Sequence, residues 1–141
     1  ISLPAGAVGL MQRALDLSLA YAGERKQFGK PIAQFQLVQE HLAAMKLDLE
    51  AARLLTYRAA WKKVKGEPYT LEASLAKLFA SEAANRVAYR AIQVHGGYGF
   101  FAEYEVARLY RDARILTLYE GTSEVQKLII GAHLTGVRAF A

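Results

Sequence analysis

The sequence of 141 residues contains no cysteine. This absence excludes disulfide frameworks, thiolate nucleophiles and cysteine-ligated metals, so any redox chemistry has to come from a bound cofactor. Apolar runs of the roughly 20 residues that span a bilayer are also lacking, and residues 1–10 show neither the charged region nor the cleavage pattern of a signal peptide. We therefore expect a soluble intracellular chain of one domain that makes no membrane contact.

A concentrated positive surface is missing as well, although the net charge is +5. The densest cluster of cations, Lys62, Lys63 and Lys65, comes directly before Gly66. Cations offset the negative end of a helix dipole and glycine ends helices, so a solvated helix terminus explains this cluster better than a nucleic-acid surface does. We expect no nucleic-acid partner.

Two further kinds of site are disfavoured by residue spacing. His41, His95 and His133 lack the i, i+4 spacing with a nearby carboxylate that zinc-binding helices use. Ser123 does not lie in a GxSxG nucleophile elbow, and together with Gln126 it fits a serine-x-x-glutamine capping box. We therefore expect neither a metal site nor a hydrolase.

Apolar residues at helical spacing predict three long helices and two short ones. The expected long helices cover residues 4–23, 38–65 and 70–95, with Thr70 as N-cap of the third. The expected short helices cover residues 103–112 and 123–131, and residues 115–119 are the one segment that could be extended. Because the long helices have short connections, the pattern predicts an all-α, antiparallel up-and-down four-helix bundle with a short extra helix near the C-terminus.

The second long helix carries a second apolar series besides the one that faces the core. Leu47, Leu54 and Trp61 follow one another at intervals of seven residues. A helix with apolar residues on more than one side is buried inside a bundle or at a subunit interface. The chain also starts with Ile1 and enters a helical pattern almost at once, so we expect it to be a piece of a longer protein.

The glycine cluster Gly96-Gly97-Tyr98-Gly99 has two interpretations. Gly97, Gly99 and Ala102 match the dinucleotide fingerprint GxGxxA, but that fingerprint works between a strand and a helix, and this cluster follows a long helix. The simpler interpretation is a helix end with a sharp chain reversal, for which glycine is the least strained residue. Close approach of the backbone to a ligand remains the alternative.

Two other segments are open to a structural and a functional interpretation. Residues 24–31 fit an ordinary connecting loop, or an anion site in which Arg25 offers a planar fork to a phosphate and Phe28 covers an apolar ring. Glu120 fits a surface or capping carboxylate, or a partly desolvated base between an apolar run and a helix start. Apolar surroundings raise the pKa of a carboxylate, and the positive end of a helix lowers it. A base that works near neutral pH needs the first effect to be the larger one.

Five segments, taken together and in order, resemble the C-terminal domain of the acyl-CoA dehydrogenase family; they are residues 24–32, 35–36, 93–100, 111–115 and 119–126. The resemblance implies that residues 1–141 form the C-terminal helical bundle domain, without the family's N-terminal helical and middle β domains. It further implies that flavin adenine dinucleotide (FAD) is the cofactor and that this domain builds the centre of a homo-oligomer, a tetramer or a dimer.

The resemblance also assigns residues to the flavin. Arg25 would reach the pyrophosphate of a flavin bound mainly to a neighbouring subunit, with Phe28 and Gln36 near its adenine half. Gln93 and Gly97 would touch the same cofactor. The flavin of the chain's own subunit would lie against Thr122 and Glu124, at the start of a helix where backbone amides point outward.

Glu120 matches the position of the family's base. By resemblance it removes the α-proton of an acyl-CoA while the β-hydrogen leaves as hydride to FAD, which gives the trans-2-enoyl-CoA, and Tyr119 and Gly121 lie beside the substrate. The family polarises the thioester carbonyl with the flavin ribityl hydroxyl and with the base's own backbone amide.

The resemblance implies electron-transfer flavoprotein as the electron acceptor and a location in the bacterial cytoplasm or the mitochondrial matrix. An acyl-CoA oxidase domain and a non-enzymatic helical oligomerisation module are the alternatives. We expect the isolated chain to fold and self-associate, but neither to bind flavin tightly nor to turn over substrate.

Overall fold

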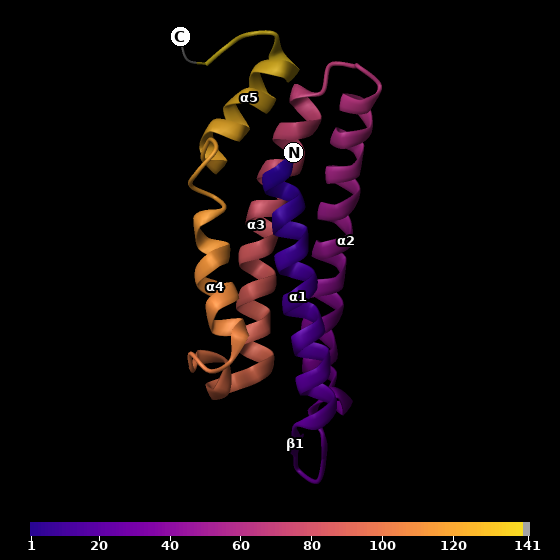
Figure 1. Ribbon diagram of the computed structural model, residues 1–141, viewed down its shortest axis with the longest axis vertical. Coiled ribbons are helices and arrows are strands. Elements are labelled where there is room, and N and C mark those ends of the chain that lie inside the picture. The colour runs from indigo at the N-terminus through magenta and orange to yellow at the C-terminus, as the bar shows by residue number, and fades with distance from the viewer. Residues whose placement is uncertain (140–141) are drawn as a thin grey trace.

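The computed structural model describes residues 1–139, and most of them are helical (Figure 1). The α-helices are α1 (Ser2–Glu24), α2 (Gln36–Val64), α3 (Thr70–His95), α4 (Glu105–Ile115) and α5 (Ser123–Thr135). The short elements are the strands β1 (Lys26–Gln27) and β2 (Lys30–Pro31) and the 3-10 helices η1 (Ile32–Gln34) and η2 (Gly96–Phe100).

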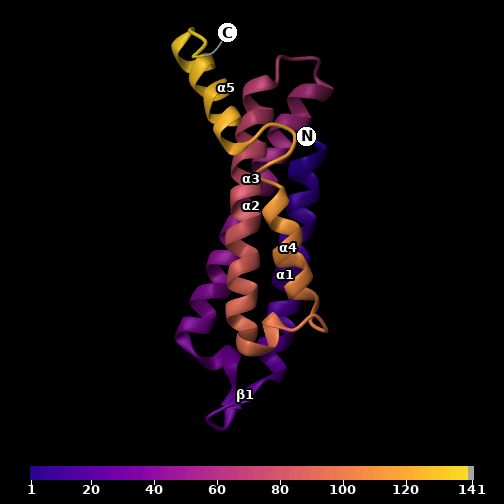
Figure 2. The same cartoon turned by 90° about the vertical axis from the view of Figure 1, so that its left-hand side faces the viewer.

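Consecutive long helices run in opposite directions, because short connections join them at alternate ends of the bundle (Figure 1). Helix α3 is the central element, since α1, α2, α4 and α5 all pack against it. Helix α4 also packs on α1 and so completes the four-helix bundle. Helix α5 packs on α3 and leans away from the bundle axis (Figure 2). The predicted fold class, an up-and-down four-helix bundle with a short extra helix, is confirmed.

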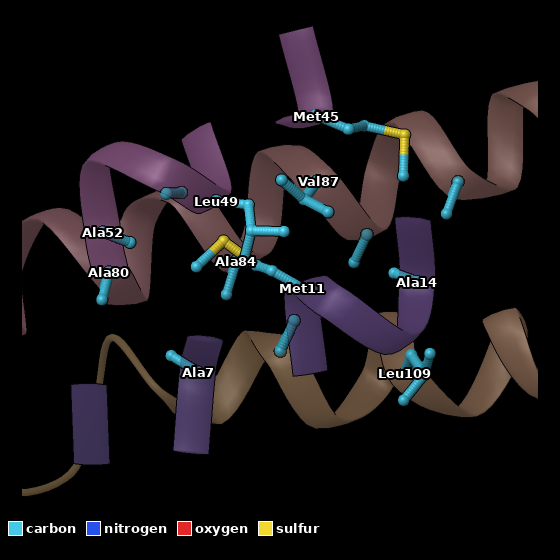
Figure 3. Close-up of a cluster of buried hydrophobic side chains, with 14 of the residues drawn as sticks. Ala7, Met11, Ala14, Met45, Leu49, Ala52, Ala80, Ala84, Val87 and Leu109 are labelled. Atoms are coloured by element: carbon cyan, nitrogen blue, oxygen red, sulfur yellow. The ribbon is translucent and has the colours of Figure 1, made fainter. Parts of the chain in front are cut away.

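Small side chains in α3 allow the neighbouring helices to approach closely. The buried alanines of this helix are Ala76, Ala80, Ala83, Ala84, Ala88 and Ala91. Met11 from α1 and Met45 and Leu49 from α2 fill the space between the helices and have no exposed area (Figure 3). Flexible methionine side chains suit such irregular gaps. The result is a thin, close-packed core that fixes where α3 presents its polar side chains.

The connection between α2 and α3 differs from the sequence prediction at two points. Thr70 is the first residue of α3, and Tyr69 occupies the cap position without a side-chain hydrogen bond, so the predicted N-cap is wrong. Lys62 does not lie in a purely solvated helix end, because its ammonium group is 2.6 Å from the carboxylate of the buried Glu72. This ion pair joins α2 to the first turn of α3 and lowers the pKa of Glu72.

The segment after α4 is not extended, contrary to the sequence prediction. Helix α4 continues to Ile115, and the next residues form turns in which the amide of Leu118 donates to the carbonyl of Ile115 at 2.9 Å. These turns bring the chain back onto α3 before α5 begins. Among residues 1–139, no helix is long and apolar enough to cross a membrane.

Candidate functional site

The sequence-predicted site residues fall into two groups. The hairpin group is defined as Arg25, Phe28, Gln36, Gln93 and Gly97, and it surrounds the end of the bundle where α1 and α3 terminate. The loop group is defined as Tyr119, Glu120, Gly121, Thr122 and Glu124, and it covers the connection between α4 and α5. Figures 1 and 2 show the hairpin at one end of the molecule and the α4–α5 connection near the other.

Residues 26–31 form a β-hairpin rather than an irregular loop. Lys26 pairs with Pro31 and Gln27 pairs with Lys30, which leaves Phe28 and Gly29 as a two-residue turn. Both turn residues have positive φ, 52° and 79°, as a type I′ turn requires. Phenylalanine is unfavourable in this conformation, and its side chain is 92% exposed. An exposed aromatic ring on a strained backbone is a feature that points to a binding role rather than to folding.

A cleft of about 650 Å³ lies between the hairpin and η2. Arg25 and Gly97 line it, together with the aromatic rings of Tyr21, His95 and Tyr98. The Tyr21 and His95 rings stack with their centroids 4.3 Å apart. Burial lowers the pKa of His95, so the neutral ring is favoured in the folded chain. The cleft therefore combines one guanidinium group with uncharged aromatic walls.

The other members of the hairpin group lie outside this cleft. Gln36 is the first residue of α2 and is exposed, and Gln93 is exposed on the last turn of α3. Neither side chain has a hydrogen-bond partner among residues 1–139. The structure thus brings Arg25 and Gly97 together and places Phe28, Gln36 and Gln93 around them as separate exposed side chains.

The loop group is centred on two consecutive residues with positive φ, Glu120 at 54° and Gly121 at 85°. Glu120 and Phe28 are the two non-glycine residues with positive φ among residues 1–139. The Glu120 side chain is exposed, so the apolar surroundings expected from the sequence are not supplied by the described chain. At Gly121, an added Cβ would lie 2.7 Å from Nε2 of Gln126. The positive φ therefore favours glycine here, and a larger residue would also displace the Gln126 amide from the turn.

Two side chains hold the carbonyl groups of this turn. The ammonium group of Lys77 donates to the Gly121 carbonyl at 2.6 Å. The amide of Gln126 donates to the carbonyls of Glu120 and Gly121 at 3.2 and 3.3 Å. A left-handed conformation costs a non-glycine residue about 1–2 kcal/mol. A hydrogen bond from a charged donor contributes about 1.5–3 kcal/mol to stability. This contribution is large enough to offset the strain at Glu120.

The start of α5 is organised differently from the predicted capping box. Thr122 is the N-cap residue, and its hydroxyl accepts from the amide of Val125 over 3.4 Å. Ser123 instead donates its hydroxyl hydrogen to Glu82 on α3 at 2.5 Å. The side-chain amide of Gln126 donates to the carbonyls of Glu120 and Gly121. The prediction of Ser123 and Gln126 as a capping box is therefore wrong, because tertiary contacts to α3 and to the turn take both side chains.

Glu124 lies in the first turn of α5. Its own backbone amide and the Thr122 hydroxyl donate to the carboxylate and lower the pKa of Glu124. The side chain is exposed and carries a full negative charge at neutral pH. Such a group accepts hydrogen bonds from hydroxyl or N–H groups of a ligand, and it would repel a phosphate.

Sequence reasoning missed Lys77 altogether and missed the contact of Gln126 with the turn carbonyls. Lys77 follows the same face of α3 as the buried Ala80, Ala84 and Val87, at spacings of three and four residues. A lysine in an apolar helical series is a detectable signal, because burial of an unpaired ammonium group is costly. Gln126 was recognised in the sequence, but only as part of a helix cap.

The two groups are far apart within one chain. Lys77 contacts the loop group, and His95 lines the cleft of the hairpin group, and both belong to the single straight helix α3. At 1.5 Å per residue these positions are separated by about 27 Å along the helix axis. Among residues 1–139, no cluster of three or more histidine and carboxylate side chains could hold a metal ion.

The model of one protein family, described as acyl-CoA dehydrogenase, C-terminal domain, matches residues 1–135. A probable acyl-CoA dehydrogenase of Bacillus subtilis (strain 168) is 53% identical over 134 residues, which are 95% of this chain and 35% of that protein. The structure of butyryl-CoA dehydrogenase from Megasphaera elsdenii superimposes with a TM-score of 0.92 at 48% identity, over 94% of this chain and 34% of that chain.

The FAD complex of PigA is a further structural relative, with a TM-score of 0.90 and 38% identity, over 93% of this chain and 34% of that chain. The chain thus spans about a third of the length of the relatives it matches. The family model and the Bacillus relative cover nearly the whole chain. This protein therefore belongs to the acyl-CoA dehydrogenase family, whose C-terminal helical domain it represents.

Proposed function

We propose that this chain is the C-terminal helical domain of an FAD-dependent acyl-CoA dehydrogenase, in which Glu120 removes the α-proton of an acyl-CoA to form the trans-2-enoyl-CoA. The observation that carries the proposal is the strained turn Glu120-Gly121, which is held from behind by Lys77 and Gln126. Backbone strain at an exposed carboxylate has no use in folding, and it is common where a side chain has to be aimed at a substrate.

The backbone of this turn suits the substrate carbonyl. Within residues 1–139, the amide groups of Glu120 and Gly121 donate no hydrogen bond, while the carbonyl groups of both residues are occupied. A thioester oxygen that accepts from the Glu120 amide would gain acidity at its α-carbon. Glu120 would then take the α-proton from the same side of the turn. Bound FAD would supply the site that accepts the β-hydrogen as hydride.

The residues of both groups fit a flavin nucleotide. Arg25 can pair with a pyrophosphate from the wall of the cleft, and Gly97 leaves that wall open, because an added Cβ there would meet nothing within 4 Å. The exposed ring of Phe28 provides a flat apolar surface for an adenine. Thr122 and Glu124, at the start of α5, provide acceptors for hydroxyl or N–H groups of the flavin half.

The separation of the two groups supports binding of FAD between two copies of the chain. A loop group and a hairpin group about 27 Å apart along α3 cannot face the same reacting atoms within one chain. We infer that the hairpin group of one copy meets the cofactor whose reactive part lies at the loop group of another. Tyr119, exposed beside Glu120, and Gly121 would line the substrate side.

Helix α2 offers a surface for such an assembly. Five of its exposed apolar residues repeat at heptad spacing, namely Leu47, Leu54, Tyr57, Trp61 and Val64. A stripe of this kind on a long helix is typical of helix-to-helix contact between subunits. It supports a homo-oligomer, a tetramer or a dimer, and we further propose electron-transfer flavoprotein as the partner that accepts the electrons.

The test is dehydrogenation of a panel of acyl-CoA thioesters by the complete protein with an artificial electron acceptor. Glu120→Gln is compared with wild type and with Glu103→Gln, which changes an exposed carboxylate outside both groups. We expect Glu120→Gln to retain flavin and to lose roughly three or more orders of magnitude in rate, and Glu103→Gln to behave as wild type. Near-normal activity of Glu120→Gln, or a wild-type protein that oxidises no acyl-CoA, would overturn the proposal.

A further inference from the structure

Lys77 is a buried lysine, and within residues 1–139 its side chain donates one hydrogen bond, which goes to the loop group. Its side chain is 6% exposed, and it comes from the face of α3 that otherwise buries alanine and valine. The ammonium group donates to the Gly121 carbonyl at 2.6 Å, across 44 positions of sequence. Buried lysines are rare unless they are paired, because removal of an ammonium group from water costs free energy. An apolar residue at this position would avoid that desolvation penalty.

Three carboxylates face the Lys77 ammonium group. The pKa of Lys77 lies below its ordinary value because burial outweighs the carboxylates of Glu120, Glu82 and Glu124, which favour the charged form. These carboxylates come from the turn, from α3 and from α5, the three segments that meet here. The ammonium group therefore lies between the helix that carries it and the negatively charged edge of the loop group.

Helix α3 also fixes the two flanks of the turn through two further hydrogen bonds. Asn85 donates to the carbonyl of Ala113 in α4 at 2.9 Å, and Glu82 accepts from Ser123 at the start of α5. Both ends of the connection are thereby anchored to the same helix. The Lys77 contact differs from these two, because it reaches the strained turn itself at the residue that follows Glu120.

We propose that Lys77 is a positioning residue for Glu120: by holding the Gly121 carbonyl, its ammonium group keeps the turn in the left-handed conformation that aims the Glu120 carboxylate. This inference rests on the proposed function of Glu120 as the base. Lys77 touches neither the substrate nor the cofactor in this assignment. It acts through the backbone of the turn, where its ammonium group makes a shorter hydrogen bond to the Gly121 carbonyl than the Gln126 amide does.

The test compares Lys77→Met and Lys77→Arg in the complete protein. Lys77→Met removes the donor and keeps an unbranched side chain that lacks the terminal nitrogen, whereas Lys77→Arg keeps a charged donor. The matched control is Lys62→Met, which removes another lysine paired with a buried partner, Glu72, in a part of the bundle away from the turn. The measurements are kcat and KM for an acyl-CoA, flavin content, Tm, and amide hydrogen exchange of residues 117–124.

We expect Lys77→Met to lower kcat roughly 10- to 100-fold while KM changes less than about twofold, because misplacement of a catalytic group affects the chemical step. Exchange of residues 117–124 should become faster, and Lys77→Arg should recover part of the rate. Lys62→Met should lower Tm without changing kcat. A Lys77→Met protein with wild-type kcat and unchanged exchange would overturn the inference, as would failure of both Lys77 variants to fold while Lys62→Met folds.

Failure of the proposed function gives a different result. If the wild-type protein oxidises no acyl-CoA, hydrogen exchange alone decides the role of Lys77. Faster exchange of residues 117–124 in Lys77→Met, and not in Lys62→Met, supports positioning of the turn. Equal exchange in the two variants overturns it.

Discussion

The guanidinium group of Arg25 lies over the ring of Tyr98, with its central carbon 5.2 Å from the ring centroid. Arg25 follows the last residue of α1, and Tyr98 belongs to η2, so the contact joins the hairpin to the end of α3. A cation–π contact of this kind contributes about 0.5–1 kcal/mol at a partly exposed site. It holds Arg25 on the wall of the cleft that also contains Gly97.

Gly97→Ala and Gly99→Ala should separate cofactor binding from folding. A Cβ added at Gly99 would lie 2.9 Å from the Ile92 carbonyl oxygen, whereas a Cβ at Gly97 would meet nothing within 4 Å. We expect Gly99→Ala to lower the free energy of unfolding by about 1–3 kcal/mol. Gly97→Ala should leave it within about 0.5 kcal/mol but reduce the FAD retained by the complete protein. Thermal denaturation and flavin absorbance measure the two effects, and equal losses of stability would contradict this assignment.

Gly121→Ala should impair the turn that carries Glu120. The new Cβ would contact Nε2 of Gln126, and the φ of 85° is unfavourable for alanine, so we expect a loss of about 1–3 kcal/mol in stability and a lower kcat. Gly131→Ala is the matched control, because it lies within α5 with open space around it. That change should stabilise the chain by about 0.5–1 kcal/mol. Denaturant titration and steady-state kinetics of both variants provide the check.

Phe28→Asn should weaken FAD binding and stabilise the folded chain. Asparagine tolerates positive φ better than phenylalanine does, and it would give the hairpin an asparagine-glycine turn. We expect the free energy of unfolding to rise by up to about 1 kcal/mol, while FAD dissociates more readily from the complete protein. Phe100→Asn, which alters another exposed aromatic residue without positive φ, should give no gain in stability. A destabilised Phe28→Asn would show that the ring contributes to folding.

His95 should make the stability of the chain depend on pH. The pKa of His95 in the folded chain lies below its ordinary value of 6.5, because burial disfavours the charged ring. The unfolded chain therefore binds more protons between these two pKa values, so stability should fall as the pH drops from about 6.5 through the folded pKa. Tm measured from pH 7.5 downward should show this decrease. His95→Gln should flatten it, and His133→Gln, on α5, should leave it unchanged.

The fold could be predicted because its helices satisfy local rules. The apolar spacing of α1 and α3 is strong enough to place both helices to within about two residues at each end. The hairpin was missed because its turn forces Phe28 into a conformation that phenylalanine rarely adopts. A local preference cannot predict a structure in which that preference is violated.

The candidate site was only partly accessible from the sequence, for a related reason. Glu120 and Gly121 are adjacent in the chain, but the group that holds them, Lys77, is distant in sequence. Ser123 has the right spacing for a helix cap but donates instead to Glu82. No sequence pattern predicts that these two residues are in contact. Local patterns predict the helices, whereas contacts between the helices determine which side chains donate hydrogen bonds to the turn.

The distance of about 27 Å along α3 between the hairpin and the strained turn has a genetic consequence. If each reactive centre takes its hairpin from one copy and its base from another, damage to Arg25 and damage to Glu120 affect different partners. Two inactive variants expressed together would then assemble some centres from the two undamaged halves. Interallelic complementation, a partial recovery of activity from two defective alleles, is therefore the expected result of such an assembly.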